Sequence, residues 1–477
     1  MTLTRFQSRA AEGSPANAGA AAPRLHVVTF GCQMNKYDSL LVEGRFKRRG
    51  WGTCDSMDAA DVVLFNTCSV RDHAEERVYS WLGELKRAKE RRPDLVIGVM
   101  GCMAQRVGDT VFARAAHVDI VCGTRRIQHL PELVDELLER RAAGGNARVL
   151  ATETDAEVAV ERDGEPYTGG LHGYLTVMRG CDLNCTFCIV PAVRGRVRSR
   201  PIEDLVREAR WMVEQGCRAV TLLGQTVNSY GEDAPAPAPG EPRGRGRQGR
   251  PSLADLLYRL QEIEGLARIR LVTLHPSYVT RELAVALREC TKCERFLPLP
   301  AQHGDDAMLR AMKRGYTPDI YRRRAALLRE ELPDIELGSD WIVGFPGETD
   351  ASYATCETFL AEQGFAVNYV FQYSSRPGTR AAEREDDVPA EAKSERNQRL
   401  LRCAERIQAE RFAAHVGAER RVFVERADER EPGRLRGRSE HGLPVAFEGE
   451  PSLVGGEVVV AIEEASAYGL AGRRRSG

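Results

Sequence analysis

Three cysteines within eight residues are the clearest chemical signal in the chain. Cys181, Cys185 and Cys188 lie in the segment RGCDLNCTFCIVP. A C-x3-C-x2-C spacing gathers three thiolates in one loop, and three soft ligands suit an iron–sulfur cluster that keeps one iron without a protein ligand. Such an iron is available for chemistry, whereas a structural zinc site is normally closed by four ligands. A zinc loop is the alternative, and it would need a fourth Cys or His nearby.

A second set of cysteines is spread over the first part of the chain. Cys32, Cys68 and Cys102 each directly follow an apolar run, in TFGC, FNTC and VMGC. If these runs are parallel strands, their carboxyl ends meet at one edge of the sheet and the three thiols converge there. We therefore expect a second three-thiolate site with an open iron. Cys122 also follows an apolar run and is the rival ligand; three unrelated buried cysteines are the alternative reading.

Apolar runs alternate with amphipathic segments around this second set. The runs predict strands over 25–30, 61–65, 95–100 and 118–121. Alternation of strands and helices is typical of βαβ units in a parallel sheet. We expect an N-terminal parallel α/β sheet domain over 24–150, preceded by a disordered Ala/Gly/Ser-rich extension over 1–23.

Six strand–helix pairs follow in the middle of the chain. The strands are expected over 173–178, 219–223, 269–274, 296–299, 335–343 and 367–373. Six such pairs make three-quarters of a (β/α)8 barrel, which carries its chemistry at the carboxyl ends of its strands. We expect a central partial (β/α)6 barrel over 167–403, with a mobile Pro/Gly/Arg-rich insertion over 234–250.

The last part of the chain has a different pattern. A long charged helix is expected over about 391–412, followed by strands over 421–425, 443–447 and 457–462 with Gly-rich turns between them. Residues 413–477 are therefore expected to form a small all-β barrel. The fold class predicted for the whole chain is α/β with this C-terminal β module.

Composition narrows the class of protein. The 477 residues carry 68 Lys and Arg against 69 Asp and Glu, a net charge of −1, which excludes a polycation that coats nucleic acid. Thirteen cysteines are an odd number, and with no secretory signal they argue against a disulfide framework. No apolar run reaches the roughly 18 residues of a membrane span. We expect a cytoplasmic protein with no membrane contact.

The cysteine loop at the start of a partial barrel resembles the radical S-adenosylmethionine superfamily, whose hallmark is this spacing. The resemblance implies a [4Fe–4S] cluster whose open iron binds the amino and carboxylate groups of S-adenosylmethionine, and which cleaves it to a 5′-deoxyadenosyl radical. It also implies cofactor-binding residues near the strand ends. These are Phe187, Gly224, Gln225 and Gln302.

Both cysteine sets on one chain resemble the methylthiotransferases, which combine a three-cysteine domain, a radical-SAM partial barrel and an RNA-binding β module called TRAM. The likeness covers residues 25–475, and FGCQMNKYDSL, GCMAQR, LGQTVNSYG and IVGFPGET are similar to the branch that acts on N6-dimethylallyladenosine in tRNA. That branch implies two [4Fe–4S] clusters, with sulfur insertion and methylation at C2 of the adenosine next to the anticodon.

The resemblance also implies partners. These are a tRNA with a prenylated adenosine, an electron donor of flavodoxin or ferredoxin type and a sulfur source, with the chain acting as a monomer. The alternatives are a methylthiotransferase for threonylcarbamoyladenosine tRNA or for a ribosomal-protein aspartate, and a non-enzymatic RNA-binding iron–sulfur protein.

Two segments depart from the family pattern. Where the family reads R-G-x-E-x-S-R, residues 194–200 read RGRVRSR, with Val197 in place of the acid. Arg194, Arg196 and Arg200 of this segment are candidates for phosphate contact; a salt-bridged helix start is the alternative. Where the family reads H-L-P-x-Q-S-G-S, residues 298–305 read PLPAQHGD. The changed positions are Pro298, His303 and Asp305, which we expect on the rim of the pocket.

Overall fold

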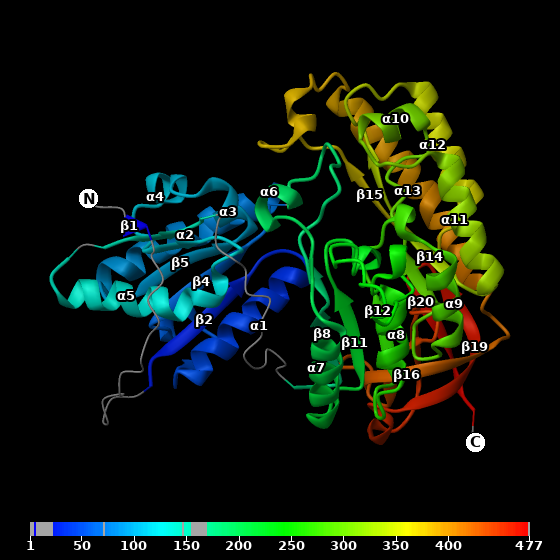
Figure 1. Cartoon of the computed structure of the whole chain (residues 1–477), viewed down its shortest axis with the longest axis horizontal. Helices are drawn as coiled ribbons and strands as arrows, with labels where there is room; N and C mark the ends of the chain where they lie inside the picture. The colour runs from blue at the N-terminus through cyan, green and yellow to red at the C-terminus, as the bar shows by residue number, and fades with distance from the viewer. Residues whose placement is uncertain (1–3, 6–21, 70–71, 146, 154–168, 476–477) are drawn as a thin grey trace. The chain divides into compact units, whose positions relative to one another are not determined.

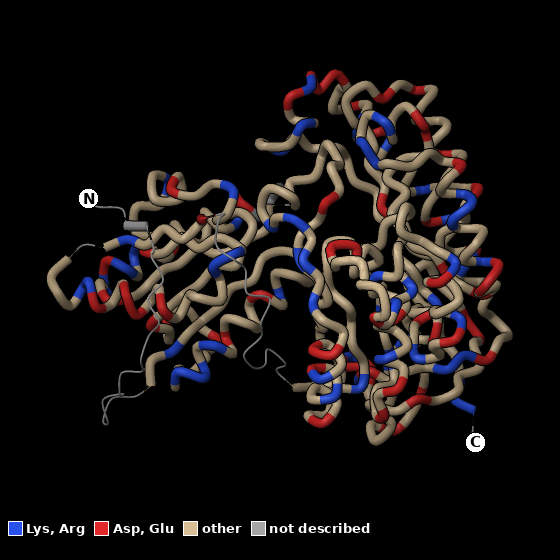
Figure 2. Tube along the Cα trace, in the orientation of Figure 1, with Lys and Arg blue, Asp and Glu red and all other residues tan. Residues whose placement is uncertain are grey.

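The computed structural model describes residues 4–5, 22–69, 72–145, 147–153 and 169–475 (Figure 1). The chain divides into two compact units. The first unit contains residues 1–168 and the short segment 189–195, and the second contains residues 169–188 and 196–477. No helix in the described part of the chain is long and apolar enough to cross a membrane. Figure 2 shows basic and acidic residues mixed along both units.

The first unit contains a seven-stranded sheet whose pairings are all parallel. Its order is β1-β7-β6-β5-β4-β2-β3. The strands are β1 (Thr4–Arg5), β2 (Arg24–Thr29), β3 (Gly52–Thr53), β4 (Val62–Thr67), β5 (Val96–Gly101), β6 (Ile120–Cys122) and β7 (Val149–Ala151). The helices are α1 (Gln33–Arg48), α2 (Asp72–Arg91), α3 (Cys102–Val107), α4 (Thr110–Arg114) and α5 (Leu130–Ala142).

Two apolar clusters cover the two faces of this sheet. One joins the strands to α1 and α5 through side chains such as Phe46 and Leu133, and the other joins them to α2 and α4 through side chains such as Leu82 and Phe112. A strand that is buried on both faces reads as a continuous apolar run rather than an alternating one. This explains why β4 and β5, each buried throughout, stand out in the sequence.

The second unit begins with six parallel strands in sequence order. Strands β8, β11 and β12 form one sheet, β13, β14 and β15 form another, and a parallel bridge between Ile269 and Cys293 joins them. The strands are β8 (His172–Thr176), β11 (Ala219–Leu223), β12 (Arg268–Leu271), β13 (Phe296–Pro298), β14 (Glu336–Val343) and β15 (Val367–Gln372). The helices are α7 (Ile202–Glu214), α8 (Leu253–Gln261), α9 (Arg281–Glu289), α10 (Asp306–Ala311), α11 (Pro318–Glu331) and α12 (Asp350–Gln363). The predicted partial (β/α)6 barrel is confirmed.

Helix α13 (Ala390–Ala413) leads to a closed five-stranded barrel with the order β16-β17-β18-β20-β19. The strands are β16 (Glu419–Ala427), β17 (Arg434–Ser439), β18 (Pro444–Glu448), β19 (Glu457–Ser466) and β20 (Gly469–Arg474). Alternate residues of the strands, such as Val422, Phe447 and Ile462, fill the barrel interior. The predicted C-terminal β barrel is confirmed.

Two further predictions concern the ends and loops of the chain. Most of the extension over 1–23 lies outside the described residues, although Thr4–Arg5 pairs with β7. The insertion over 234–250 has internal hydrogen bonds such as Gly244 N to Gly249 O at 2.8 Å, and Arg245 forms a 2.9 Å ion pair with Asp255 on α8. These contacts tie the insertion to the start of that helix; its mobility stays a prediction.

Candidate active site

The C-x3-C-x2-C loop lies in the second unit, directly after the short strand β9 (Met178–Arg179). Cys181 and Cys185 are buried and Cys188 is half-buried, and none of the three forms a disulfide. Gln225, two residues after β11, accepts a hydrogen bond from the amide of Gly180 at 2.5 Å. One of the predicted cofactor residues therefore supports the backbone of the cysteine loop.

Two polar side chains contact the sulfurs of this loop. Arg314 donates a hydrogen bond from Nη1 to Sγ of Cys185 at 3.2 Å, and Thr226 Oγ1 lies 3.3 Å from Sγ of Cys181. A hydrogen bond to either sulfur stabilises it when it carries negative charge, as a cluster ligand does. Burial nevertheless raises the pKa of Cys181, and the hydrogen bond from Thr226 acts in the opposite direction.

Arg314 is buried among polar groups, and the sequence alone did not identify it as a residue of the site. Burial alone would lower its pKa, but Tyr316 and Cys185 overcome burial and raise it. Tyr316 donates from its hydroxyl to the carbonyl of Ala301 at 2.8 Å, which fixes this segment. Asp340 of β14 lies within electrostatic range of Arg314, and burial raises the pKa of its carboxyl to about 6. Arg314 thus provides a permanent positive charge beside the cysteine loop.

The other predicted cofactor residues also lie in the second unit. Phe187 packs against an apolar cluster that includes Met312 and Phe345. Gly224 directly follows β11, and a Cβ there would fall 2.6 Å from Cγ of Met178. Gln302 follows β13, has a φ of +67°, and donates from its amide to the carbonyl of Asp340 at 2.9 Å. Contact between these residues and a cofactor stays a prediction.

The structure corrects the expected place of His303. This side chain is fully buried, and Nε2 lies 3.0 Å from Oε1 of Glu348. The other oxygen of Glu348 accepts from the amide of Gly344 and from Arg396, both at 2.8 Å. Burial alone would lower the pKa of His303, but Cys356 and Glu348 reverse this effect and raise it to about 10. His303 is therefore enclosed beside the loop that follows β14 and is not exposed on the rim.

The other departures also have structural roles. Asp305 caps α10, because its side chain accepts from the amide of Met308 at 3.0 Å. Val197 is buried, and its amide donates to Oδ1 of Asp182 at 3.1 Å. Pro298 is the last residue of β13.

In the first unit, three neighbouring strands bring Cys32, Cys68 and Cys102 to one edge of the sheet. Cys32 precedes α1 after β2, Cys68 follows β4, and Cys102 begins α3 after β5. A Cβ on Gly31 would fall 2.7 Å from the Cβ of Cys68, so the first two turns touch. Burial raises the pKa of Cys102 to about 11, and Cys68 and Cys32 act on it electrostatically in the same direction.

Two buried asparagines hold these turns together. Asn35 donates from Nδ2 to Oδ1 of Asn66 at 2.8 Å and to the carbonyl of Thr67 at 3.0 Å. Asn66 donates in return to the carbonyl of Asn35 at 2.7 Å, and the Cys32 thiol donates to Oδ1 of Asn35 at 3.3 Å. Asn35 is the last residue of the GCQMN motif, so the motif has a structural purpose that spacing alone does not reveal.

The rival cysteine, Cys122, points into the hydrophobic core. It is opposite Met100 in the register of β5 and β6, and both belong to the cluster on the α1 and α5 side of the sheet. Burial raises the pKa of this thiol strongly. Cys122 is therefore a packing residue in this structure.

The three arginines expected to contact phosphate differ in exposure. The Arg196 side chain is 89% exposed and lies 3.2 Å from Asp182. Arg194 and Arg200 are only 5% and 7% exposed, and they pair with Asp38 at 2.9 Å and with Glu208 at 2.7 Å. Phosphate contact requires an accessible guanidinium, so the burial of Arg194 and Arg200 does not support that role for them.

The donor chemistry of both cysteine sets fits an iron–sulfur cluster. Within the described ranges, no three His, Cys, Asp or Glu side chains are placed to hold a single metal ion. A cluster makes a different demand, because each of its three thiolates binds a different iron. Each set offers three cysteines free of disulfides, and N–H or O–H groups reach the sulfurs in the second unit.

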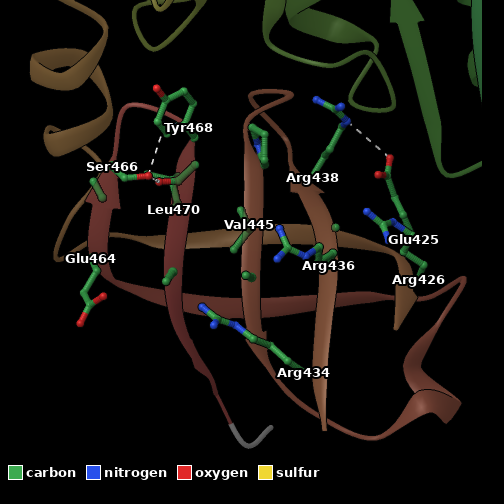
Figure 3. A pocket seen from close by; sticks show the side chains of 16 residues that line it. Glu425, Arg426, Arg434, Arg436, Arg438, Val445, Glu464, Ser466, Tyr468 and Leu470 are labelled. Atoms are coloured by element: carbon green, nitrogen blue, oxygen red, sulfur yellow. Dashed lines mark hydrogen bonds and ion pairs between the residues drawn. The ribbon is translucent and has the colours of Figure 1, made fainter. Parts of the chain in front are cut away.

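A basic surface lies on the C-terminal barrel (Figure 3). Arg434, Arg436 and Arg438 alternate along β17, so they lie on one face of the strand. They line a shallow cavity of about 410 Å³ together with Arg426 and Tyr468, and Tyr468 is 86% exposed. Figure 3 shows Arg438 paired with Glu425, at 3.6 Å. The module is not basic in bulk, but four of its arginines line this cavity, together with Glu425 and Glu464.

Three families match the chain in succession. Residues 24–123 match "Uncharacterized protein family UPF0004", residues 175–359 match the radical SAM superfamily, and residues 413–473 match the TRAM domain. A radical S-adenosylmethionine methyltransferase, TsrM from Kitasatospora setae, has a similar fold, with a TM-score of 0.54 over 76% of this chain and 75% of that chain at 16% identity. Fold and site together define a radical SAM protein with an added TRAM domain.

Curated relatives of similar length narrow this class. The tRNA-2-methylthio-N(6)-dimethylallyladenosine synthase of Bordetella avium is 39% identical over 467 residues, covering 96% of this chain and 94% of the relative. The same-named proteins of Syntrophotalea carbinolica and Coxiella burnetii are 38% and 39% identical, each covering 94% of this chain and 99% of the relative. The chain belongs to the tRNA-2-methylthio-N(6)-dimethylallyladenosine synthase family, and it is a transferase.

Proposed function

We propose that this chain inserts sulfur and a methyl group at C2 of N6-dimethylallyladenosine next to the anticodon of tRNA. The observation that carries the proposal is the pair of three-cysteine sets, one in each unit, in a chain of this family. An aromatic C–H bond is too strong and too weakly acidic for a side-chain base. When bound, S-adenosylmethionine and [4Fe–4S] clusters supply the radical chemistry that side chains lack.

The six cysteines are the proposed cluster ligands. Cys181, Cys185 and Cys188 would hold the cluster that binds S-adenosylmethionine, and the remaining set would hold the second cluster. That set is Cys32, Cys68 and Cys102. Thr226 and Arg314 contact the sulfurs of Cys181 and Cys185 and would stabilise their negative charge as cluster ligands. Cys181 and Cys185 are buried, so little of either residue is open to water.

The basic face of the C-terminal barrel is the proposed RNA contact. Guanidinium groups bind phosphate oxygens, and an exposed aromatic ring can stack on an unpaired base. Arg434, Arg436 and Arg438 have carboxylate partners, so phosphates would replace those partners on binding. Arg196 is accessible for a further phosphate contact.

Other aspects of the proposal follow from the family alone. An electron donor of flavodoxin or ferredoxin type and a sulfur source would serve the reaction. We propose that the chain acts as a monomer in the cytoplasm, where tRNA and reduced thiols are available.

Nucleoside mass spectrometry of tRNA from a deletion strain tests the function. We expect loss of the 2-methylthio group with the prenyl group retained, restored by the wild-type gene and by the control Cys403→Ala, but not by Cys185→Ala. An unchanged profile would point to the ribosomal-protein aspartate, and a change confined to threonylcarbamoyladenosine to the sister tRNA substrate. Restoration by Cys185→Ala would favour a non-enzymatic RNA-binding protein.

Iron analysis tests the assignment of the cysteines. Anaerobically reconstituted protein should contain about eight Fe per chain, because each [4Fe–4S] cluster contributes about four. Cys32→Ala and Cys185→Ala should each reduce the content to about four, whereas Cys122→Ala should retain about eight. A content near four that does not change with Cys32→Ala would contradict the second cluster.

A further inference from the structure

A buried ion pair lies beside the cysteines of the first unit. Nη2 of Arg194 lies 2.9 Å from Oδ2 of Asp38, and the two side chains are 5% and 0% exposed. Removing two charges from water costs several kcal/mol for each ion, so a buried pair is a weak source of stability. Its position next to a three-cysteine set suggests a different purpose.

The first unit itself holds both partners in place. Asp38 lies on α1, the helix that begins directly after Cys32. Arg194 ends α6 (Val190–Arg194), which lies in the segment 189–195 assigned to the first unit. Ile189 and Val193 pack against Cys102, and the Thr124 hydroxyl donates to the carbonyl of Val193. These contacts keep the guanidinium at the edge of the sheet that carries the cysteines.

The guanidinium acts on the cysteines electrostatically. Arg194 interacts with Cys102, Asp38 and Cys32, and these interactions raise its pKa although burial acts against them. Arg194 is the last residue of the short helix α6, and Ile189 and Val193 of the same segment pack against Cys102, so the positive charge of Arg194 lies beside that cysteine. A cluster held by thiolates is negatively charged, so a buried positive charge at this place stabilises it electrostatically.

We propose that Arg194 is a positioning residue for the second iron–sulfur cluster, and that Asp38 orients its guanidinium and limits its charge. The inference rests on the proposed assignment of Cys32, Cys68 and Cys102. A cluster held by three thiolates carries net negative charge, which increases on reduction. A fixed positive charge therefore favours the reduced state, since net charge and hydrogen bonding are among the factors that set cluster potentials.

The test isolates the second cluster in the full-length chain. The parent protein carries Ala at positions 181, 185 and 188, is reconstituted anaerobically, and is titrated while the reduced cluster is followed by electron paramagnetic resonance. Arg194→Gln should lower the midpoint potential, and Asp38→Asn should raise it. The double variant removes the pair as a neutral unit, so its potential should lie close to that of the parent. Arg194→Lys keeps the charge and should shift the potential less than Arg194→Gln does.

The control is Arg114→Gln, an exposed arginine of the first unit, which should leave the potential unchanged. Thermal unfolding and iron content of every variant identify a loss of fold. If Arg194→Gln binds no iron, two variants still test the charge effect. The midpoint potential of Asp38→Asn should lie above that of the parent, and the potential of the double variant should lie below that of Asp38→Asn.

Four results would overturn the proposal. A charge effect would be excluded if the midpoint potential shifted in the same direction in both single variants. It would also be excluded if the potential did not shift while about four Fe remained bound. Either result would leave the cysteine assignment intact. Weaker tRNA binding by Arg194→Gln with an unchanged potential would indicate phosphate contact instead. A parent protein without iron would refute the assignment of the cysteines, and the role of Arg194 with it.

Discussion

At the scale of single residues, a buried ion pair explains the departure from the family pattern at His303. His303 replaces a small polar residue of the family pattern, yet it is enclosed and meets Glu348 at 3.0 Å. The same carboxylate accepts from Arg396 and from the amide of Gly344, the first residue after β14. His303 therefore supports the loop that follows β14, and its effect on the site is indirect.

This network predicts a pH dependence of stability. Because the folded pKa of His303 is raised from 6.5 to about 10, its contribution is fully present below pH 6.5 and is lost as the pH rises through about 10. His303→Gln should lower the free energy of unfolding by about 3 kcal/mol near pH 6.5, since breaking a buried pair leaves Glu348 less compensated. Urea unfolding at both ends of this range measures the effect. The wild type and the variant should converge near pH 10, and an equal difference at both ends would contradict the prediction.

A second residue-scale prediction concerns Arg314. Its hydrogen bond to Cys185 needs a donor on a long side chain, and its positive charge stabilises a negatively charged sulfur ligand. Arg314→Gln should reduce the iron bound by the C-x3-C-x2-C loop, whereas Arg314→Lys should retain more of it. Iron analysis in a Cys32→Ala background isolates this cluster, and Arg310→Gln is the exposed control on the neighbouring helix. Equal iron content in the Gln and Lys variants would exclude an effect of charge.

At the scale of elements, burial on both faces decides what the sequence can predict. The apolar pattern predicts β11 with its observed bounds and β4 nearly so, because each is a continuous apolar run inside its unit. The same pattern misses β17 and β20, since RLRGRS and GLAGRR carry few apolar residues and owe their strand conformation to pairing within the closed barrel.

The candidate site can be predicted from the sequence only in part, because some of its contacts join residues that are far apart in the chain. The cysteine positions follow from local spacing and from strand ends. The contact of Arg314 with Cys185 joins residues 129 positions apart. No local pattern links them, and only the folded barrel brings them together. The ion pair of Arg194 with Asp38 likewise spans 156 positions.

The turn between β5 and α3 gives a prediction at this scale. Gly101 has a φ of +99°, and a Cβ there would lie 2.5 Å from Oδ1 of Asn66 and 2.6 Å from the carbonyl oxygen of Thr67. Gly101→Ala should lower the free energy of unfolding by about 2 kcal/mol or more, through backbone strain and steric clash. It should also reduce the iron bound by the first unit.

The matched control for this turn is Gly83→Ala. Gly83 lies on α2, and a Cβ there would meet no atom within 4 Å, so alanine should stabilise the helix by up to about 1 kcal/mol. Chemical unfolding compares the two variants. Stabilisation by Gly101→Ala would show that the turn can relax.

At the scale of the whole molecule, the chain has a net charge of nearly zero, and its basic and acidic residues are mixed (Figure 2), but one cavity of the C-terminal barrel is lined by four arginines. The basic face of the C-terminal barrel combines arginines from β17 with the exposed ring of Tyr468. Charge and stacking contribute differently to RNA binding, because only the charged groups release counterions. The two contributions can therefore be separated by their salt dependence.

Replacing Arg434, Arg436 and Arg438 by Gln should weaken tRNA binding and flatten its salt dependence. The slope of log K against log salt should fall by about 0.7 to 0.9 for each phosphate that is no longer neutralised. Tyr468→Ala should weaken binding with the slope unchanged, and Arg406→Gln on α13 is the exposed control. Filter binding over a salt series measures all of these. An unchanged slope in the triple variant would exclude this face as the phosphate-binding surface.

The segment 189–195 has a consequence for how the protein can be divided. It belongs to the first unit, while the residues on both sides of it belong to the second. The polypeptide therefore crosses between the units three times, and no single cut separates them. A fragment ending near residue 168 would lack Ile189 and Val193, which cover Cys102. To study the amino-terminal unit alone, the segment 189–195 would have to be fused to it or added as a separate peptide.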